Sequence, residues 1–316
     1  MAQAAYDLAI IGGGPAGLSA GIYGARAGLS TVILEQLSPG GQVITTDMVE
    51  NYPGFTEPIS GYEIAGKMIE QATKFGVEIR SSDVTGINDP PGEDHKLLLM
   101  GDESLSALAV IIATGAHHRR LGVPGEDRFW GRGVSCCATC DGMFYRDKEV
   151  VVVGGGDTAV KEAMFLTRFA SKITLVHRRD RLRATNILRD RILAMTDKVD
   201  FSWKTVVKEI MGDDNVAAVR LSSVDTGAER VLECDGVFIF VGFTPNTKFL
   251  DGFIKLDERG YVITDEDMAT SVPGVFACGD ARKKLLRQII TACGEGATAA
   301  FAAQHYVEDI KGTAYE

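Results

Sequence analysis

The sequence lacks several features that would each assign it to a familiar class of protein. No stretch reaches the roughly 18 uninterrupted apolar residues of a membrane span, and the first residues hold no basic group of the kind that opens a signal peptide. A net charge of −10 argues against nucleic acid as a main partner. Six cysteines in 316 residues are too few for a disulfide scaffold, so we expect a protein of the reducing cytoplasm.

Glycine, by contrast, is abundant, with 36 residues. Much of it stands at the ends of apolar runs, which suits tight turns between strands and helices. The length predicts about two domains.

A glycine-rich turn near the N-terminus has the pattern of a dinucleotide site. A strand, a helix and a second strand follow one another within residues 8–34, and the G-x-G-x-x-G motif of Gly12, Gly14 and Gly17 falls between the first two. The N–H groups and positive dipole of that helix N-terminus suit a pyrophosphate. Glu35 ends the second strand, where an acid would bond a ribose hydroxyl.

A second unit of the same kind spans residues 149–176 and has its glycine turn at residues 154–159. Where the first unit ends in Glu35, this one continues into Arg178 and Arg179. Cations suit a 2′-phosphate, so this site should prefer NADPH to NADH. The alternative is that these arginines form only a solvated basic face.

The two units predict the domain organisation. Buried strands at residues 108–115 and 236–242 close the two units, and the last segments add a strand and a helix without a phosphate loop. We therefore predict an α/β protein with two Rossmann-like, three-layer (ββα/βαβ) nucleotide-binding domains, the second inserted in the first. The first is expected at 1–115 and 246–316, and the second at 116–245.

A close cysteine pair, in Cys137-Ala138-Thr139-Cys140-Asp141, lies between the two glycine turns. This position suggests that electrons pass from one cofactor, through the other, to a disulfide. A zinc half-site is the alternative, but structural zinc uses four ligands and the chain has no second close pair, so we expect no metal. Asp141 is either a turn residue or a general acid that protonates a thiolate.

The order of the motifs carries a family resemblance over essentially the whole chain. The motifs are Gly12 to Gly17, Gly40-Gly41-Gln42, Glu50 to Gly54, Ala113-Thr114-Gly115, Cys137 to Gly142, Gly154 to Ala159, His177-Arg178-Arg179, Gly279-Asp280 and Arg287-Gln288. Together they resemble the low-molecular-weight, bacterial-type thioredoxin reductases of the pyridine nucleotide-disulfide oxidoreductase family. The resemblance implies FAD in the first domain, NADPH in the second, a homodimer, and thioredoxin as the protein substrate.

The resemblance also implies which residues bind the cofactors. Those expected for FAD are Gly12, Gly14, Pro15, Ala16, Gly17, Glu35, Gln36, Gly41, Gln42, Asn51, Ala113, Thr114, Gly115, Gly279, Asp280, Arg287, Gln288 and Ile289. Those expected for NADPH are Gly154, Gly156, Asp157, Thr158, Ala159, His177, Arg178, Arg179 and Arg183. Asp280 would bind the ribityl chain of the flavin.

The implied chemistry takes electrons from NADPH through FAD to a disulfide, whose thiols then reduce thioredoxin by thiol–disulfide exchange. Cys137 and Cys140 are the expected pair, since a bond from Cys136 to its neighbour would strain the chain. The resemblance favours the acid role for Asp141. Because one dithiol cannot face a flavin and an external protein at once, we expect one domain to rotate against the other.

Two departures from the family pattern are Lys161, where an acid usually precedes Glu162, and the extra thiol of Cys136. Four other functions compete with the reductase. The flavin subunit of a peroxide-reducing system usually has an extra N-terminal domain, whereas this chain begins directly at its first strand. An oxygen-using dithiol oxidase would not need the second nucleotide site. A ferredoxin–NADP reductase would lack the cysteine pair, and a non-enzymatic flavin sensor would not require it.

Overall fold

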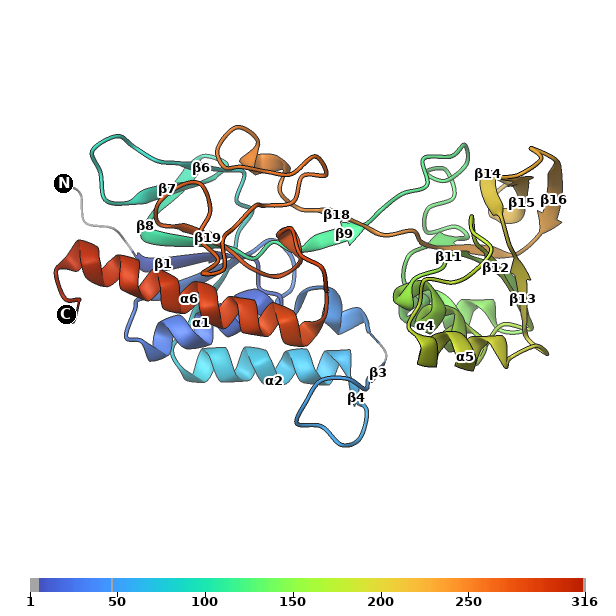
Figure 1. The fold of residues 1–316 in the computed structure, drawn as a ribbon, viewed down its shortest axis with the longest axis horizontal. Coiled ribbons are helices and arrows are strands. Elements are labelled where there is room, and N and C mark those ends of the chain that lie inside the picture. Colours follow the sequence, from blue (N-terminus) through green and yellow to red (C-terminus); the bar gives the residue numbers. More distant parts are fainter. Residues whose placement is uncertain (1–5, 47, 315–316) are drawn as a thin grey trace. The chain divides into compact units, whose positions relative to one another are not determined.

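The chain folds into two compact units, each with its own parallel sheet. The computed structural model describes residues 6–46 and 48–314. Unit 1 comprises Met1–His117 and Thr244–Glu316, and unit 2 is the continuous segment His118–Phe243. In Figure 1 the elements of unit 1 therefore take their colours from both ends of the bar, and those of unit 2 from its middle.

The sheet of unit 1 has the strand order β5-β2-β1-β8-β7-β6, with β19 beside β8. Its parallel strands are β5 (Glu78–Ser81), β2 (Thr31–Glu35), β1 (Tyr6–Ile11), β8 (Glu103–Ile112) and β19 (Val275–Ala277). The antiparallel strands β7 (Lys96–Met100) and β6 (Gly86–Asn88) extend one edge. The central strands are nearly continuous apolar runs because both faces of this part of the sheet are covered.

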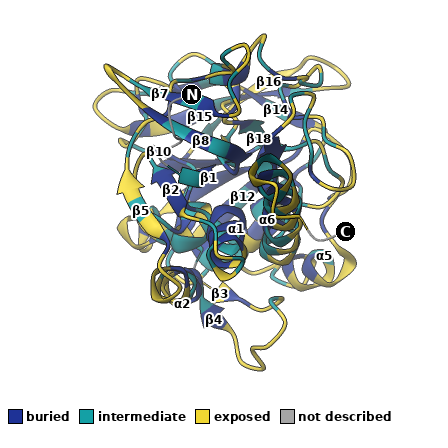
Figure 2. Ribbon diagram, turned by 90° about the vertical axis from the view of Figure 1, so that its left-hand side faces the viewer, coloured by how far each residue is buried: buried dark blue, intermediate teal, exposed yellow. Residues whose placement is uncertain are grey.

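Three helices belong to unit 1, namely α1 (Pro15–Arg26), α2 (Gly61–Lys74) and α6 (Ile289–Lys311). Alternate side chains of the central strands enter two cores, because successive residues of a strand point to opposite faces. Leu8 and Ile10 pack with residues of α1 and α6 on one face, whereas Ala9 and Ile11 pack with Leu250 on the other. Figure 2 shows the central strands in the dark blue of buried residues, while much of α2 is exposed.

Unit 2 consists of three layers around a parallel sheet of order β10-β17-β11-β12-β13. The strands are β10 (Val134–Ser135), β17 (Gly236–Phe240), β11 (Glu149–Gly154), β12 (Lys172–Val176) and β13 (Val199–Ser202). The helices α4 (Asp157–Leu166) and α5 (Asn186–Leu193) pack on one face. The antiparallel strands β14 (Thr205–Gly212), β15 (Val216–Ser223) and β16 (Glu229–Glu233) form a separate sheet, and β14 and β15 pack on the other face.

Short elements complete the fold. They are the 3₁₀ turns η1 (Gly41–Thr45), η2 (Gly142–Tyr145), η3 (Lys248–Leu250) and η4 (Gly279–Ala281), the strands β3 (Met48–Val49), β4 (Ile59–Ser60), β9 (Ala116–His118) and β18 (Phe243–Pro245), and the helix α3 (Ala138–Asp141). Strands β9 and β18 pair with each other where the chain passes between the units. Among the described residues, no helix is long and apolar enough to cross a membrane. The chain is thus a mixed α/β protein with two Rossmann-like units, as the sequence predicts.

Candidate functional site

The glycine turn of unit 1 brings three elements into close contact. Gly12 has φ +105°, and a Cβ there would lie 2.4 Å from the carbonyl oxygen of Ala113 at the end of β8. A Cβ at Gly17 would lie 1.9 Å from the carbonyl oxygen of Gly12, so only glycine lets α1 begin this close to β1. Pro15 starts α1, and Gly14 caps it without a side-chain hydrogen bond. The first N–H groups of α1 therefore have no capping side chain and suit a phosphate.

Glu35 lies beside this turn, at the end of β2. Its Oε2 accepts a hydrogen bond from Gly13 N–H at 2.7 Å, and its Oε1 accepts one from Leu37 N–H at 3.0 Å. Each carboxylate oxygen has a further lone pair, so the acid can still accept a ribose hydroxyl. The neighbouring Gln36 is exposed.

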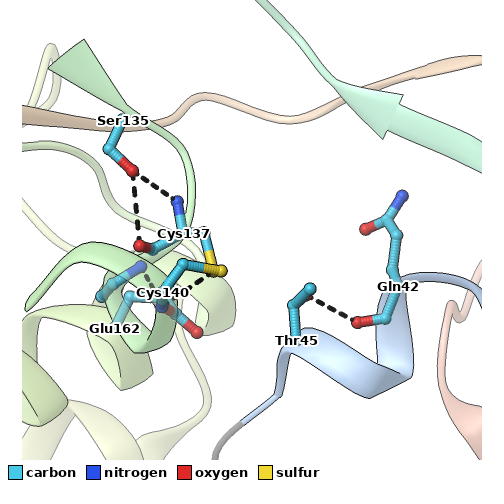
Figure 3. Close-up of a disulfide and its surroundings, with 7 residues drawn as sticks. Gln42, Thr45, Ser135, Cys137, Cys140 and Glu162 are labelled. Atoms are coloured by element: carbon cyan, nitrogen blue, oxygen red, sulfur yellow. Dashed lines mark hydrogen bonds between the residues drawn. A yellow bond between two sulfur atoms is a disulfide. The ribbon is translucent and has the colours of Figure 1, made fainter. Parts of the chain in front are cut away.

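The early loops of unit 1 reach the same region. A Cβ at Gly41 would lie 3.0 Å from Cα of Gly14, so η1 passes close to the glycine turn. The side-chain amide of Gln42 donates to the backbone carbonyl of Ala116. The backbone carbonyl of Gln42 accepts a hydrogen bond from the Thr45 hydroxyl (Figure 3). The segment at η1 thus lies beside this turn and is hydrogen-bonded to β9.

The C-terminal segment of unit 1 contributes the remaining expected flavin residues. The amide of Asn51 donates to Oε1 of Gln288 at 2.9 Å, which joins two of them directly. Arg287 lies with its guanidinium carbon 4.3 Å from the ring centre of Tyr261, and Gln288 caps α6. Ile289, the first residue of α6, follows directly.

Two polar atoms of the expected flavin residues, Thr114 Oγ1 and Arg287 Nε, are buried and have no hydrogen-bond partner among the described residues. Asp280 Oδ1 is also buried, but it lies 3.3 Å from the Lys284 ammonium. A buried polar group left unsatisfied costs about 1–3 kcal/mol, so such atoms point to a polar ligand. Together with the closely packed glycines and the N-terminus of α1, they fit FAD. The other expected flavin residues of these two segments are sequence neighbours: Ala113 and Gly115 flank Thr114, and Gly279 precedes Asp280.

Unit 2 contains a cavity of about 520 Å³ at the second glycine turn. Seven of the nine expected NADPH residues line it: Gly154, Gly156, Thr158, Ala159, His177, Arg178 and Arg183. Asp157 and Arg179 do not. Instead, Asp157 Oδ1 accepts a hydrogen bond from Thr185 N–H at 2.7 Å and so fixes the loop that carries Arg183.

Part of the lining of this cavity comes from residues that belong to no sequence motif. His118, Arg119, Arg120 and Phe243 line it together with Phe240. The His118 ring lies 4.8 Å from the Phe243 ring and 5.9 Å from the Phe240 ring. Only the tertiary fold brings these residues together, since more than a hundred positions separate His118 from Phe240.

His177 is buried, lines the cavity and lies directly against Gly155. A Cβ at Gly155 would lie 2.4 Å from the His177 ring. Burial, and then the positive charges of Arg183, Arg179 and Arg178, hold the pKa of His177 below its usual value. The imidazole is thus neutral at pH 7, and its buried Nε2 has no partner among the described residues. This unpaired atom and the neighbouring guanidinium groups fit a phosphorylated nucleotide such as NADPH.

The cysteine pair lies at the start of α3, where Cys137 and Cys140 form a disulfide (Figure 3). Cys137 Sγ accepts a hydrogen bond from Cys140 N–H at 3.1 Å, and Ser135 Oγ accepts one from Cys137 N–H at 3.0 Å. Glu162 Oε2, on α4, accepts one from Ala138 N–H at 3.1 Å. Glu162, the acid that follows Lys161, therefore holds α3 against α4.

The other groups near the disulfide differ in exposure. Cys140 is exposed, and Asp141, which ends α3, is partly exposed. Burial raises the pKa of the Cys136 thiol; the positive charge of Arg120 lowers it, and Asp141 raises it. Cys136 is thus a free thiol that is protonated and poorly nucleophilic at neutral pH. The described residues contain no group of three or more His, Cys, Asp or Glu that could hold a metal ion.

Comparison with known proteins gives consistent matches along the chain. The family model described as pyridine nucleotide-disulphide oxidoreductase matches residues 6–296. The chain is 50% identical to a thioredoxin reductase of Listeria innocua over 307 residues, which are 97% of this chain and 95% of the relative. It is also 50% identical to a thioredoxin reductase of Bacillus subtilis over 309 residues, 98% of this chain and 96% of the relative.

A solved structure supports the same relationship. The crystal structure of Lactococcus lactis thioredoxin reductase in its FR conformation superposes with a TM-score of 0.93 at 45% identity. The match covers 96% of this chain and 99% of that one.

Proposed function

The chain belongs to the pyridine nucleotide-disulphide oxidoreductase family, among the low-molecular-weight bacterial thioredoxin reductases that use FAD and NADPH, and we propose that thioredoxin is its own substrate. The observation that carries this proposal is the disulfide between Cys137 and Cys140, because Cys140 is exposed to solvent. A purely structural disulfide would be expected to lie buried.

We assign the two cofactors to different units. Unit 1 binds FAD through the Gly12 turn, Glu35 and Asp280, and unit 2 binds NADPH through its arginine-lined cavity and carries the dithiol. The unpaired polar atoms in unit 1 and the unpaired His177 nitrogen in unit 2 support this division. FAD, when bound, would accept two electrons from NADPH and deliver them to the disulfide.

The residues around the disulfide then act on the protein substrate. One thiolate of the pair attacks the substrate disulfide, and the other resolves the mixed disulfide that forms. Glu162 and Ser135 hold α3 in position during this exchange through their hydrogen bonds to its first N–H groups. Asp141, one residue beyond Cys140, supplies the proton for the departing thiolate.

The surface next to the dithiol suits a protein partner. Met143 and Phe144 come three and four residues after Cys140 and are 63% and 67% exposed, which is unusual for such large apolar side chains. Thioredoxin would cover both when its own disulfide approaches Cys140. Arg146 and Lys148, both exposed, would favour an acidic rim on the partner.

The dithiol must serve both a cofactor and an external protein, and we propose that unit 2 rotates against unit 1 between these steps. The only covalent connections between the units run through β9 and β18, and two short connections form a simple hinge. We further propose a cytoplasmic homodimer. Four free cysteines suit a reducing compartment, and exposed Tyr23 and Phe301 on unit 1 offer apolar surface to a second copy.

A coupled assay tests the proposed function. NADPH oxidation is followed with thioredoxin, with NADH in place of NADPH, and with oxygen alone. We expect a thioredoxin-dependent rate that requires NADPH and disappears in Cys140→Ser. Absence of any thioredoxin-dependent rate in the flavin-loaded protein would sink the proposal.

A further inference from the structure

Four charged side chains, including that of Asp280, form a largely buried cluster in unit 1. Lys284 Nζ lies 3.3 Å from Asp280 Oδ1 and 3.3 Å from Glu295 Oε2. Arg282 Nη1 lies 3.1 Å from Glu295 Oε1. The cluster holds two cations and two carboxylates, so its formal charges balance.

Lys284 is the most deeply buried member of this cluster. Its side chain is only 6% exposed, compared with 36% for Asp280. Lysine is seldom buried to this extent unless it is paired, because its ammonium group loses its hydration. Lys284 has no role in either nucleotide motif, so its burial needs another explanation.

Glu295 links this cluster to the FAD-binding turn. Its Oε2 also accepts a hydrogen bond from Gly279 N–H at 2.8 Å, directly before Asp280. Its neighbour on α6, Gly296, lies so close to α1 that a Cβ there would be 2.1 Å from the carbonyl oxygen of Ala16. The charges of the cluster are therefore fixed next to the first turn of α1.

The orientation of Asp280 follows from these contacts. Its Oδ1 is inaccessible to solvent, has no hydrogen-bond donor among the described residues, and lies next to the Lys284 ammonium. The exposure of the side chain therefore falls on its other atoms. With Oδ1 beside a largely buried ammonium, Oδ2 is the oxygen left for a ligand.

We propose that Lys284 is a positioning residue for FAD binding, which holds the Asp280 carboxylate in the orientation that accepts a hydroxyl of the flavin nucleotide. This inference rests on the assignment of FAD to unit 1. Lys284 acts through Asp280 and needs no contact with the cofactor. Glu295 also pairs with the Lys284 ammonium, and it accepts a hydrogen bond from Gly279 N–H, which joins the Gly279 backbone to the same cluster.

The test is a double-mutant cycle on flavin release. Holoenzyme is diluted, and the rise of free-flavin fluorescence gives the rate of FAD release for the wild type, Lys284→Met, Asp280→Asn and the double variant. We expect Lys284→Met to accelerate release by about tenfold or more, since it removes the cation beside the inaccessible Oδ1 of Asp280. In the Asp280→Asn background the same change should alter the rate by less than about threefold, because coupled residues are not additive.

Three controls separate positioning from a general loss of stability. Lys283→Met removes the adjacent exposed lysine and should leave the release rate unchanged. Lys284→Arg, which keeps the charge, should keep the release rate close to that of the wild type. Lys284→Gln, which removes the charge but keeps a polar group, takes the place of Lys284→Met in the cycle if the latter does not fold.

Equal acceleration by the Lys284 change in both backgrounds, or no acceleration in either, would overturn the inference. A wild-type protein that binds no FAD would instead contradict the proposed function. The two failures are therefore distinguishable in one experiment.

Discussion

The two glycine turns of this protein have similar sequences but are followed by different residues at the end of the second strand. In unit 1 the strand after the turn ends at Glu35, whose carboxylate is bonded to two backbone N–H groups. In unit 2 the equivalent strand is followed by His177 and Arg178, which line a cavity rich in guanidinium groups. On the proposed assignment, the shared turn would recognise the pyrophosphate that both cofactors possess, and the residue at the end of the second strand would discriminate between them.

The third position of the two turns also differs, and this gives the largest expected effect. Unit 1 has Gly17, where a Cβ would lie 1.9 Å from a carbonyl oxygen, whereas unit 2 has Ala159. Gly17→Ala therefore introduces into unit 1 the residue that unit 2 tolerates. We expect a loss of about 1–3 kcal/mol in the free energy of unfolding, together with loss of bound FAD.

Gly156→Ala is the matched control for this change, because nothing lies within 4 Å of a Cβ at that position. Chemical denaturation and the ratio of flavin to protein absorbance measure both outcomes. If Gly17→Ala were as stable and as flavin-loaded as the control, close packing at the unit 1 turn would not be required.

The arginines that line the cavity of unit 2 should give the next largest effect. Replacing both Arg178 and Arg183 with alanine should raise the KM for NADPH by about tenfold to a hundredfold, since charge-assisted hydrogen bonds to the 2′-phosphate are lost. The KM for NADH, which lacks that phosphate, should change little. Arg181→Ala is the control, as Arg181 is exposed and does not line the cavity. An equal rise for both coenzymes would contradict the phosphate assignment.

His177 in unit 2 should have a smaller effect, on how the stability of the protein depends on pH. Its pKa in the folded protein is below the usual value, so the unfolded chain binds a proton more readily as the pH falls through the range of an ordinary histidine. His177 therefore lowers the stability of the protein at acidic pH relative to pH 7. A His177→Gln variant should lose less stability between pH 7 and about pH 5 in denaturant titrations, because it has no group to protonate. An unchanged pH dependence would show that His177 is not the group responsible.

The smallest effect is expected at the extra thiol. Cys136 is partly buried, and its raised pKa keeps it protonated, so Cys136→Ser should retain most of the disulfide-reductase activity. Steady-state rates with thioredoxin measure this directly. A loss comparable to that of Cys140→Ser would mean that Cys136 takes part in the exchange.

The sequence predicts the parts of this molecule that depend on neighbouring residues. The apolar strands, the glycine turns and the contrast between Glu35 and Arg178 all have local patterns, and the order of the motifs indicates the family. The short helix α3 escapes such a prediction, because Asp141-Gly142 also suits a turn.

Other features arise only from tertiary contacts. Glu162 contacts the dithiol helix from 24 residues away, and His118 packs against Phe240 in the lining of the cavity of unit 2. Nothing in the local sequence of Lys284 indicates that it is buried between two carboxylates. These contacts depend on how distant segments pack, which spacing and composition do not encode.

The central claim is that electrons reach thioredoxin only through the Cys137–Cys140 pair. The most direct measurement is anaerobic mixing of NADPH and thioredoxin with a variant in which both cysteines are serine, following flavin absorbance and thioredoxin thiols together. We predict that NADPH still bleaches the flavin, while no thioredoxin thiols appear. Thioredoxin reduction at the wild-type rate in this variant would contradict the account.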